Sequence, residues 1–417
     1  MLKDGILNFF KTLRSFGVEY SKESYTCGSI ALNHYIKSYN KINLNLPKNI
    51  SNAVRKSFFG GRCEVFGNKR GNEKVLHFDF KGMYQQCMLE ELPHGNFTYK
   101  DESLDISVPG FYYVKLESYN YIPALPTRSS KLLFKSGVIE GLYWHEEIEL
   151  ALRVSSVKSF KVIYGFISDT NSPVLVDFIN DINKIRELGG LKRELGKLLI
   201  NSFYGRLGLG DELSVLSLKE GKPDTDVYGH FEDYFLVKTV LKRRPKSNVA
   251  IASAITSKAR IRLYKAFLEV IRSGGRVLYC DTDSVFASFE RTANVENRNL
   301  GEYVFFDTSK SDTVIKDCVF VLPKTYGVLL ESGEEVIKFK GVNISSLTLS
   351  KLKSSFYSGE RTLQLTSDHI KTNNMEVLYH LQKKEINIQA YDKRVWSDDY
   401  SDTRPLTSIS THIECTK

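Results

Sequence analysis

Two aspartates standing between two apolar runs constrain the local fold of this chain more than any other feature. Val277–Cys280 precede Asp281-Thr282-Asp283-Ser284, and Val285–Ala287 follow it. The apolar flanks predict two paired strands joined by a tight turn that carries both carboxylates. Residues i and i+2 of a strand share a face about 7 Å apart. Because a turn would splay them, we expect one aspartate to lead and the other to assist. The alternative is a solvated polar turn without function.

A third carboxylate lies near the end of another apolar run. Asp79 closes the predicted strand Lys74–Phe80. A buried carboxylate is costly unless it is paired or coordinates a metal, and the alternative is that Asp79 faces water. With Asp281 and Asp283 it could complete a carboxylate cluster for two hard cations. Mg²⁺ prefers one or two carboxylates plus substrate phosphates, and two such ions about 4 Å apart would suit in-line phosphoryl transfer.

A helix predicted over residues 181–207, with an interruption at Gly189-Gly190, has two unlike sides. At 100° per residue, one side is a cationic stripe that ends in an amide and a phenol, formed by Arg186, Arg193, Lys197, Asn201 and Tyr204. The opposite side is predicted to be core and carries Leu188, Leu191, Leu195, Leu198 and Leu199. An ordinary amphipathic helix also has a solvated basic face. The end of the stripe favours a nucleotide site, with cations on phosphates and an aromatic edge under the base.

Composition adds three constraints. Lys+Arg 58 against Asp+Glu 49 gives a net charge of +9, which favours a polyanionic partner. No apolar run approaches 18 residues, so we expect no membrane span, and the six cysteines form no CxxC pair of the kind that a zinc site uses. Residues 1–57 read as mostly helical, and residues 250–271 predict another helix. Strands from distant parts of the sequence with helices between them indicate an α+β fold.

These segments, in this order, resemble the motifs of family B DNA polymerases. Asp79-Phe80-Lys81-Gly82-Met83-Tyr84 resembles motif A, and Lys197–Gly205 matches motif B, K-x-x-x-N-S-x-Y-G. Tyr279–Ser284 matches motif C, Y-x-D-T-D-S. Two further matches are Lys324-Thr325-Tyr326, which fits the K-x-Y motif, and Ala252–Arg260, which resembles the helix before motif C. The five ordered matches cover residues 58–341.

Within the family, the chain is most similar to the protein-primed branch of linear mitochondrial plasmids and certain phages. Phe58-Phe59-Gly60-Gly61 stands where that branch has Tyr-x-Gly-Gly, a link that contacts the template. The resemblance implies a right-hand fold with an antiparallel palm, helical fingers and a small thumb. The domains expected are a helical lead-in (1–57), palm with motif A (58–92), a terminal-protein-region insertion (93–175), fingers (176–207), a second insertion (208–248), palm with motif C (249–345) and thumb (346–417).

The resemblance also implies a role for each motif residue. Asp79 and Asp283 would be the principal ligands of two Mg²⁺ ions, with Mn²⁺ as an alternative and Asp281 close by. Tyr84, beside Met83, would be the steric gate against a ribose 2′-hydroxyl. The incoming nucleotide would be held by Lys197, Asn201, Tyr204 and a further cation, Arg186 or its rival Lys184. DNA and the primer terminus would be contacted by Phe58, Gly60, Gly61, Arg62, Thr282, Lys324 and Tyr326.

The implied activity is template-directed addition of dNTPs to a primer 3′-hydroxyl. The expected partners are template, primer and dNTPs, with a terminal protein as a candidate primer, no membrane, and a monomeric enzyme. Phe 25 and Tyr 23 against Pro 10 suggest an A+T-rich source, for which a mitochondrial plasmid or its remnant fits. The alternatives are a silent remnant that only binds DNA, and a reverse transcriptase, which the threonine between Asp281 and Asp283 disfavours.

Three departures from the family pattern accompany these matches. Gln85 stands where proline follows the gate tyrosine, Gly82-Met83 replaces Ser-Leu, and Phe58 lacks the hydroxyl of the tyrosine in the link. We expect adjusted geometry rather than lost chemistry. Only 78 residues precede Asp79, and none forms the D-x-E motif of a proofreading exonuclease. We therefore expect either lost proofreading or a piece of a longer reading frame.

Overall fold

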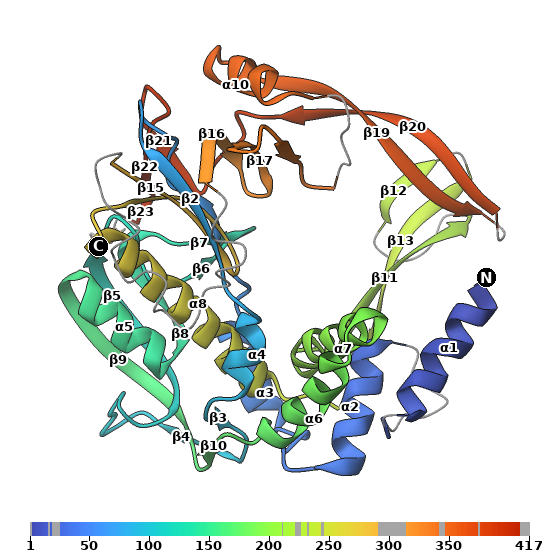
Figure 1. Cartoon of the computed structure of the whole chain (residues 1–417). Helices are drawn as coiled ribbons and strands as arrows, with labels where there is room; N and C mark the ends of the chain where they lie inside the picture. The colour runs from blue at the N-terminus through green and yellow to red at the C-terminus, as the bar shows by residue number, and fades with distance from the viewer. Residues whose placement is uncertain are drawn as a thin grey trace. The chain divides into compact units, whose positions relative to one another are not determined.

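The computed structural model describes residues 2–15, 17–18, 26–210, 212–221, 227–231, 233–242, 246–290, 314–341, 347–373 and 376–408. The chain divides into two compact units (Figure 1). Unit 1 comprises Met1–Phe58, Met88–Thr98 and Ser168–Ile255, and unit 2 comprises Phe59–Cys87, Tyr99–Ile167 and Thr256–Lys417. Helices and strands mix in both, which confirms the α+β class. Among the described residues, no helix is long and apolar enough to cross a membrane.

Unit 2 is built on a seven-stranded antiparallel sheet that joins segments far apart in the sequence. The strand order is β1-β14-β15-β2-β16-β17-β18. The bounds are β1 Cys63–Val65, β2 Lys74–Asp79, β14 Arg276–Asp281, β15 Ser284–Phe289, β16 Val314–Leu322, β17 Thr325–Leu330 and β18 Glu335–Lys338. Its core includes the stacked rings of Tyr279 and Phe320, with centroids 5.1 Å apart. The strands predicted at residues 74–80 and before Asp281 are confirmed.

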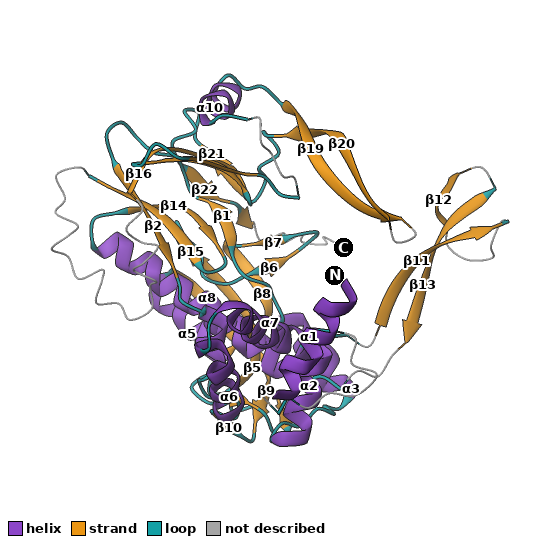
Figure 2. Cartoon of the chain, turned by 45° about the vertical axis from the view of Figure 1, so that its right-hand side comes forward, coloured by secondary structure: helices purple, strands orange, loops and turns teal. Residues whose placement is uncertain are grey.

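A five-stranded sheet, mostly in unit 2, has the order β23-β8-β5-β9-β4. The bounds are β4 Phe97–Lys100, β5 Gly110–Tyr119, β8 Ser136–Trp144, β9 Ser156–Ser168 and β23 Thr407–Ser408. One face of β5 is fully buried through Tyr112, Val114 and Leu116. Helix α5 (His145–Val154) packs against β5 and β8. Figure 2 shows the long helix α8 (Val249–Arg272) leading towards β14. The short elements are α4 Met83–Met88, β6 Thr127–Arg128 and β7 Leu132–Leu133.

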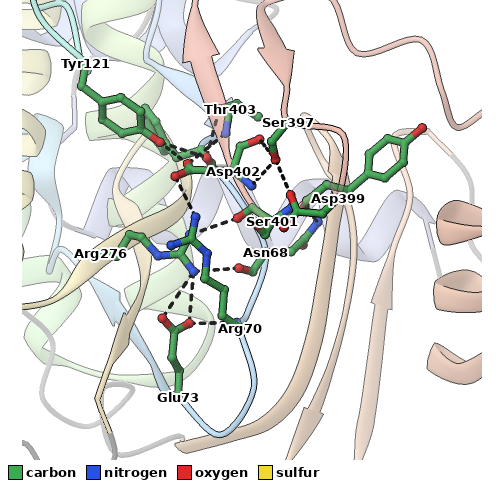
Figure 3. A network of polar contacts seen from close by, with 12 residues as sticks. Asn68, Arg70, Glu73, Tyr121, Arg276, Ser397, Asp399, Ser401, Asp402 and Thr403 are labelled. Carbon is green, nitrogen blue, oxygen red and sulfur yellow. Dashed lines mark hydrogen bonds and ion pairs between the residues drawn. The ribbon is translucent and has the colours of Figure 1, made fainter.

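The last part of the described chain is fastened to the seven-stranded sheet. Helix α10 (Leu349–Tyr357) is followed by the hairpin β19 (Thr362–Asn373) and β20 (Glu376–Asn387), then by β21 (Arg394–Trp396) and β22 (Thr403–Pro405). Figure 3 shows the polar network that holds this segment. The Arg276 guanidinium donates to the backbone oxygens of Asn68 (2.9 Å) and Ser401 (3.1 Å) and pairs with Glu73. Asp402 pairs with Arg70 and accepts from Tyr121.

Unit 1 is mainly helical. Its helices are α1 Leu2–Ser15, α2 Cys27–Ser38, α3 Lys48–Val54, η1 Arg55–Ser57, α6 Val176–Glu187 and α7 Gly190–Leu207. The rings of Tyr35, Phe178 and Phe203 pack together, with centroids 4.6–5.5 Å apart. A Cβ built on Gly28 would lie 3.0 Å from the backbone oxygen of Ser202, so α2 and α7 approach closely. The strands are β3 Leu92–Pro93, β10 Asn171–Ser172, β11 Glu212–Glu220, β12 Val227–Phe231 and β13 Tyr234–Lys242.

The structure corrects the helix predicted over residues 181–207. The interruption is real, because Gly189 (φ +71°) and Gly190 (φ +53°) take positive φ values between α6 and α7. Arg186 therefore does not continue the stripe of Lys197, since the two lie on different helices. The predicted leucine core is only partly right. Leu195 and Leu199 are buried, whereas Leu188, Leu191 and Leu198 are exposed, because the buried side of α7 is centred on Leu199, Ile200 and Phe203.

The predicted domain limits remain predictions. The limit between palm and thumb at residues 345/346, parts of the second insertion (211, 222–226, 232 and 243–245) and the final residues 409–417 lie outside the described residues.

Candidate active site

One row of residues crosses four strands of the seven-stranded sheet. Cys63 is opposite Asp281, Asp281 is opposite Ser284, and Ser284 is opposite Asp79. Directly opposed residues of antiparallel strands share a face, so Asp79 and Asp281 lie on one face with Ser284 between them. Asp283 is in the adjoining turn, where its backbone oxygen accepts a hydrogen bond from Phe80 N at 2.8 Å. The sheet thus brings together the three carboxylates that were singled out in the sequence.

The turn between β14 and β15 is tight, as predicted. Thr282 has φ +63°, and Asp283 N donates to Asp281 O at 2.7 Å. A β-branched residue rarely adopts a positive φ, and such backbone outliers collect at functional sites. Thr282 N donates to Arg62 O at 2.7 Å, so the segment before β1 holds the strained turn.

Lys324 approaches the row from the turn between β16 and β17. Its Nζ donates to both carboxylate oxygens of Asp281, at 2.8 and 2.9 Å. Burial lowers the pKa of Lys324, but the hydrogen bond and charge of Asp281, with Cys63 and Asp283 adding, outweigh burial and raise the pKa above its usual value. The turn is positioned by Tyr279, whose hydroxyl accepts from Lys324 N at 2.9 Å. The lysine of K-x-Y therefore lies beside motif C.

Tyr326, the second residue of that motif, packs among aromatic rings. Its ring centroid lies 5.2 Å from that of Tyr279 and 5.5 Å from that of Phe286. Burial, followed by the charges of Asp281 and Cys63, raises the pKa of Tyr326 to about 12. Its hydroxyl is therefore protonated at neutral pH and can donate a hydrogen bond.

Gly61 is a point of close approach between the predicted link, the turn and the candidate gate. A Cβ built on Gly61 would lie 2.8 Å from Thr282 Cγ2 and 3.1 Å from the Tyr84 hydroxyl oxygen. Tyr84 is half-buried on α4, whereas the neighbouring Met83 is buried. Gly60, in contrast, has no atom within 4 Å of such a Cβ. Only the second glycine of the pair is required by local packing.

Arg260 and Glu147 hold the backbone of the link in place, and neither was assigned a role from the sequence. Arg260 on α8 is buried and donates to the backbone oxygens of Phe59 (2.8 Å) and Gly60 (3.1 Å). Its other nitrogens bind the buried Glu147 carboxylate at 2.6 and 2.9 Å. The only signal in the sequence for this role of Arg260 was that Ala252–Arg260 resembles the helix before motif C. Nothing in the sequence paired it with Glu147, 113 residues away.

Arg62 was predicted to contact DNA, and its side chain is buried. Nε donates to Glu64 at 2.7 Å, and the guanidinium lies 3.9 Å from the ring centroid of Phe134. Arg62 contacts the turn between β14 and β15 through its backbone oxygen, which accepts the hydrogen bond from Thr282 N. Its side chain is therefore part of the core of unit 2.

The remaining predicted residues lie in unit 1. Lys197, Asn201 and Tyr204 follow one face of α7, the first two exposed and the third half-buried. The ring of Phe58 is within 2.6 Å of a Cβ built on Gly208, so Phe58 packs at the end of α7. Arg55 donates to the backbone oxygens of Gly208 and Leu209, a support that the sequence did not indicate.

The two rival cations of unit 1 have different surroundings. Arg186 packs on α7, because a Cβ on Gly196 would lie 2.4 Å from Arg186 Cγ. Burial, followed by the charge of Arg193, lowers the pKa of Arg186. Exposed Lys184 pairs with Asp181 at 2.7 Å. The charge of Arg193 thus acts on Arg186 against the opposing charge of Glu194, whereas Lys184 pairs with Asp181.

The donor set of the carboxylate row suits a hard cation that also binds phosphate. The described residues hold no group of three or more His, Cys, Asp or Glu that could by itself retain a metal ion. Mg²⁺ does not require such a group, since it is commonly held by one or two carboxylates plus substrate phosphates. Asp79, Asp281 and Asp283 are carboxylates of the kind that such an ion uses, and Asp281 also pairs with Lys324.

Residues 1–232, more than half of the chain, match the model of the family described as DNA polymerase type B, organellar and viral. The chain is 25% identical to a probable DNA polymerase of Podospora anserina over 94% of this chain, and 27% identical to one of Neurospora intermedia over 82%. These matches span only 37% and 38% of the two relatives. The DNA-directed DNA polymerase of Enterobacteria phage PRD1 is 24% identical over 72% of this chain and 55% of its own.

The fold is similar to that of Phi29 DNA polymerase complexed with primer-template DNA. The TM-score is 0.66 at 17% identity, and the match covers 91% of this chain and 70% of the other. The likeness confirms the fold expected from the motifs.

Proposed function

Because this chain belongs to the organellar and viral type B DNA polymerases, we propose that it is a DNA-directed DNA polymerase that extends a primer 3′-hydroxyl along a template. The observation that carries the proposal is the row Asp79–Ser284–Asp281, with Asp283 in the adjoining turn. The carboxylates of this row are half-buried, and the row collects negative charge where a triphosphate with its cations would be received.

In the proposed reaction, Asp79 and Asp283 hold two Mg²⁺ ions, or Mn²⁺ in their place. When bound, these ions would neutralise charge on the attacking and leaving oxygens of the transfer. Asp281 holds Lys324 towards the primer terminus, and Tyr326 stands beside it as a hydrogen-bond donor. Positioning and charge neutralisation supply most of the rate in such transfers.

The roles proposed for nucleotide selection follow the motifs. Tyr84 excludes a ribose 2′-hydroxyl, and the backbone next to Met83 approaches the phosphates. On α7, Lys197 binds the triphosphate, while Asn201 and Tyr204 line the nascent base pair. Arg186, whose side chain packs against Gly196 of α7, is proposed as the second cation, with Lys184 as its rival.

The DNA is held by the link and the turn. Gly60, Gly61 and the backbone of Arg62 approach the template side with Phe58, and Thr282 stands at the turn. We further propose that the chain acts as a monomer on an organellar element such as a mitochondrial plasmid, with a terminal protein as primer. The family's description as organellar and viral supports this source.

The test is primer extension by the purified chain on a primed single-stranded template with Mg²⁺. Template-directed products from the parent and none from Asp283→Asn are expected, with matching melting curves for both proteins. A parent that melts cooperatively but extends no primer would contradict the proposal and favour a remnant that binds DNA. Residual incorporation above a few per cent in Asp283→Asn would remove Asp283 from the metal site.

A further inference from the structure

The five-stranded sheet carries a face rich in tyrosine and lysine, which we call the tyrosine face. It comprises Tyr99 of β4, Tyr113 and Lys115 of β5, and Lys161 and Tyr164 of β9. Tyr113 is directly opposite Tyr164, and Lys115 is directly opposite Lys161. Opposed residues share a face of the sheet, so the tyrosines and the lysines point to the same side. None of these residues belongs to the candidate active site.

The three tyrosines form a continuous aromatic surface. The rings of Tyr113 and Tyr164 are stacked, with centroids 4.9 Å apart and an interplanar angle of 8°. Tyr99 follows at 5.8 Å from Tyr164. Tyr99 is 53% exposed, so a large ring area at this end of the row faces solvent.

The lysines of the same face are not neutralised. Like charges placed directly opposite each other destabilise a sheet, yet Lys115 and Lys161 are such a pair, and both are exposed. Within the described part of the chain, neither makes an ion pair. Glu140, opposite Lys115, instead accepts a hydrogen bond from the Tyr113 hydroxyl at 2.9 Å. Sheet stability therefore does not explain the lysine pair, whereas an anionic partner would.

The reverse side of the sheet is already covered, so the tyrosine face is its open side. Tyr112, Val114 and Leu116 alternate with the residues of the tyrosine face along β5 and are fully buried. A third lysine lies at the end of the open side, where Lys158 Nζ stands 4.7 Å from the ring centroid of Tyr119 and 3.8 Å from the Glu117 carboxylate. Aromatic rings next to lysines thus continue along β5 and β9.

We propose that the tyrosine face binds single-stranded DNA. Aromatic rings stack on bases whatever the sequence, and neighbouring cations hold the phosphates of the strand. A protein partner fits less well, because lysine is depleted in protein–protein interfaces. Tyr99 and Tyr164 stack on bases, while Lys115 and Lys161 contact the backbone.

The test is the binding of fluorescein-labelled dT12, followed by anisotropy without dNTPs. The chain is first saturated with an unlabelled hairpin primer–template that has a short overhang, so that binding at the polymerase site is blocked. The parent is expected to bind dT12 under these conditions. Replacing Tyr99 and Tyr164 together by alanine should weaken binding at least about fivefold. Replacing both by phenylalanine should preserve binding, since the rings remain.

The charge arm uses Lys115→Glu and Lys161→Glu, with Lys265→Glu on α8 as the matched control. Both tyrosine-face variants should weaken binding and reduce its dependence on salt, and the control should match the parent. Equal binding by all variants would overturn the proposal and leave a protein partner for this face. The binding assay contains no dNTPs, so its result does not depend on whether the chain extends a primer. Melting curves of every variant show whether it is folded.

Discussion

Asp281 and Lys324 lie 43 residues apart in the sequence, and Nζ of the lysine binds both carboxylate oxygens of the aspartate at 2.8 and 2.9 Å. Asp281 therefore holds a lysine beside the turn. Asp79 and Asp283 are the carboxylates that we propose as principal metal ligands. The sequence pattern had left open which aspartate of the turn leads.

The ion pair should be visible as energetic coupling in catalysis. Asp281→Asn and Lys324→Met should each lower kcat/KM for single-nucleotide incorporation. The double variant should lose less than the product of the two single losses, by about fivefold, because the second change removes a partner that is already lost. The matched control is Lys353 with Asp317, an ion pair of similar geometry at 2.7 and 2.8 Å, which should leave incorporation unchanged. Independent effects of the two active-site changes would contradict the assignment.

Gly61→Ala should destabilise the chain by about 1–3 kcal/mol, because the new methyl group meets Thr282 and the Tyr84 hydroxyl and forces both to move. Gly60→Ala is the control, since its methyl group meets nothing and alanine restricts the unfolded chain slightly. Urea unfolding of the three proteins measures the difference. Equal stability of the two variants would show that the link does not pack against the turn as described.

Much of the site could be predicted because its parts are short and local. The apolar runs on either side of Asp281 and Asp283 predicted two strands, and the polar residues between the runs predicted the turn. That Asp79 could complete a carboxylate cluster with them was a hypothesis, and the pairing of β2 with β15 that puts it there was not predicted. Periodicity alone does not show that strands about 200 residues apart are neighbours.

The features that were missed or mistaken depend on long-range packing. The face of α7 that becomes core is set by Phe178 and Tyr35 of other segments, so leucine positions alone misplaced Leu191 and Leu198. The partnership of Arg260 with Glu147 joins α8 to α5, and neither residue has a local signal. Arg62 was predicted to contact DNA. The structure buries its side chain against Phe134, which the sequence did not indicate.

Arg260 and Glu147 form a buried pair, with side chains 3% and 1% exposed, and each should be more costly to remove alone than together. Arg260→Leu should lower the free energy of unfolding by about 3–5 kcal/mol, because it strands a buried carboxylate. Combining it with Glu147→Leu should restore part of the loss. Chemical unfolding of the two single variants and the double variant measures this. A double variant less stable than both single variants would contradict the account.

Tyr84→Val should relax the selection against ribonucleotides. The smaller side chain leaves space where the tyrosine ring would meet a 2′-hydroxyl, and Gly61 keeps the hydroxyl end of that ring in place. The ratio of kcat/KM for dCTP and CTP, measured opposite a template guanine, should fall at least tenfold. Tyr84→Phe is the control and should keep the ratio, because the ring is retained. Unchanged selectivity in Tyr84→Val would mean that another residue is the gate.

Acidification should weaken the fold through His145, the first residue of α5. Burial lowers the pKa of His145 below its usual value of 6.5, and nearby Lys258 lowers it further against the opposing effect of Glu146. A histidine with a lowered pKa in the folded state contributes stability that is fully present above pH 6.5 and is lost as the pH falls below it, because the unfolded chain then binds more protons. The Tm of the parent should therefore fall between pH 7.5 and 5.5.

The matched variant is His145→Gln, which cannot be protonated and should lose less Tm over the same range. Half-buried His94, whose pKa burial also lowers, is present in both proteins and cancels in the comparison. The range excludes more acidic pH because burial raises the pKa of Glu149, whose carboxylate lies 3.8 Å from His145. Parallel Tm curves for parent and variant would show that His145 is not held neutral by the fold.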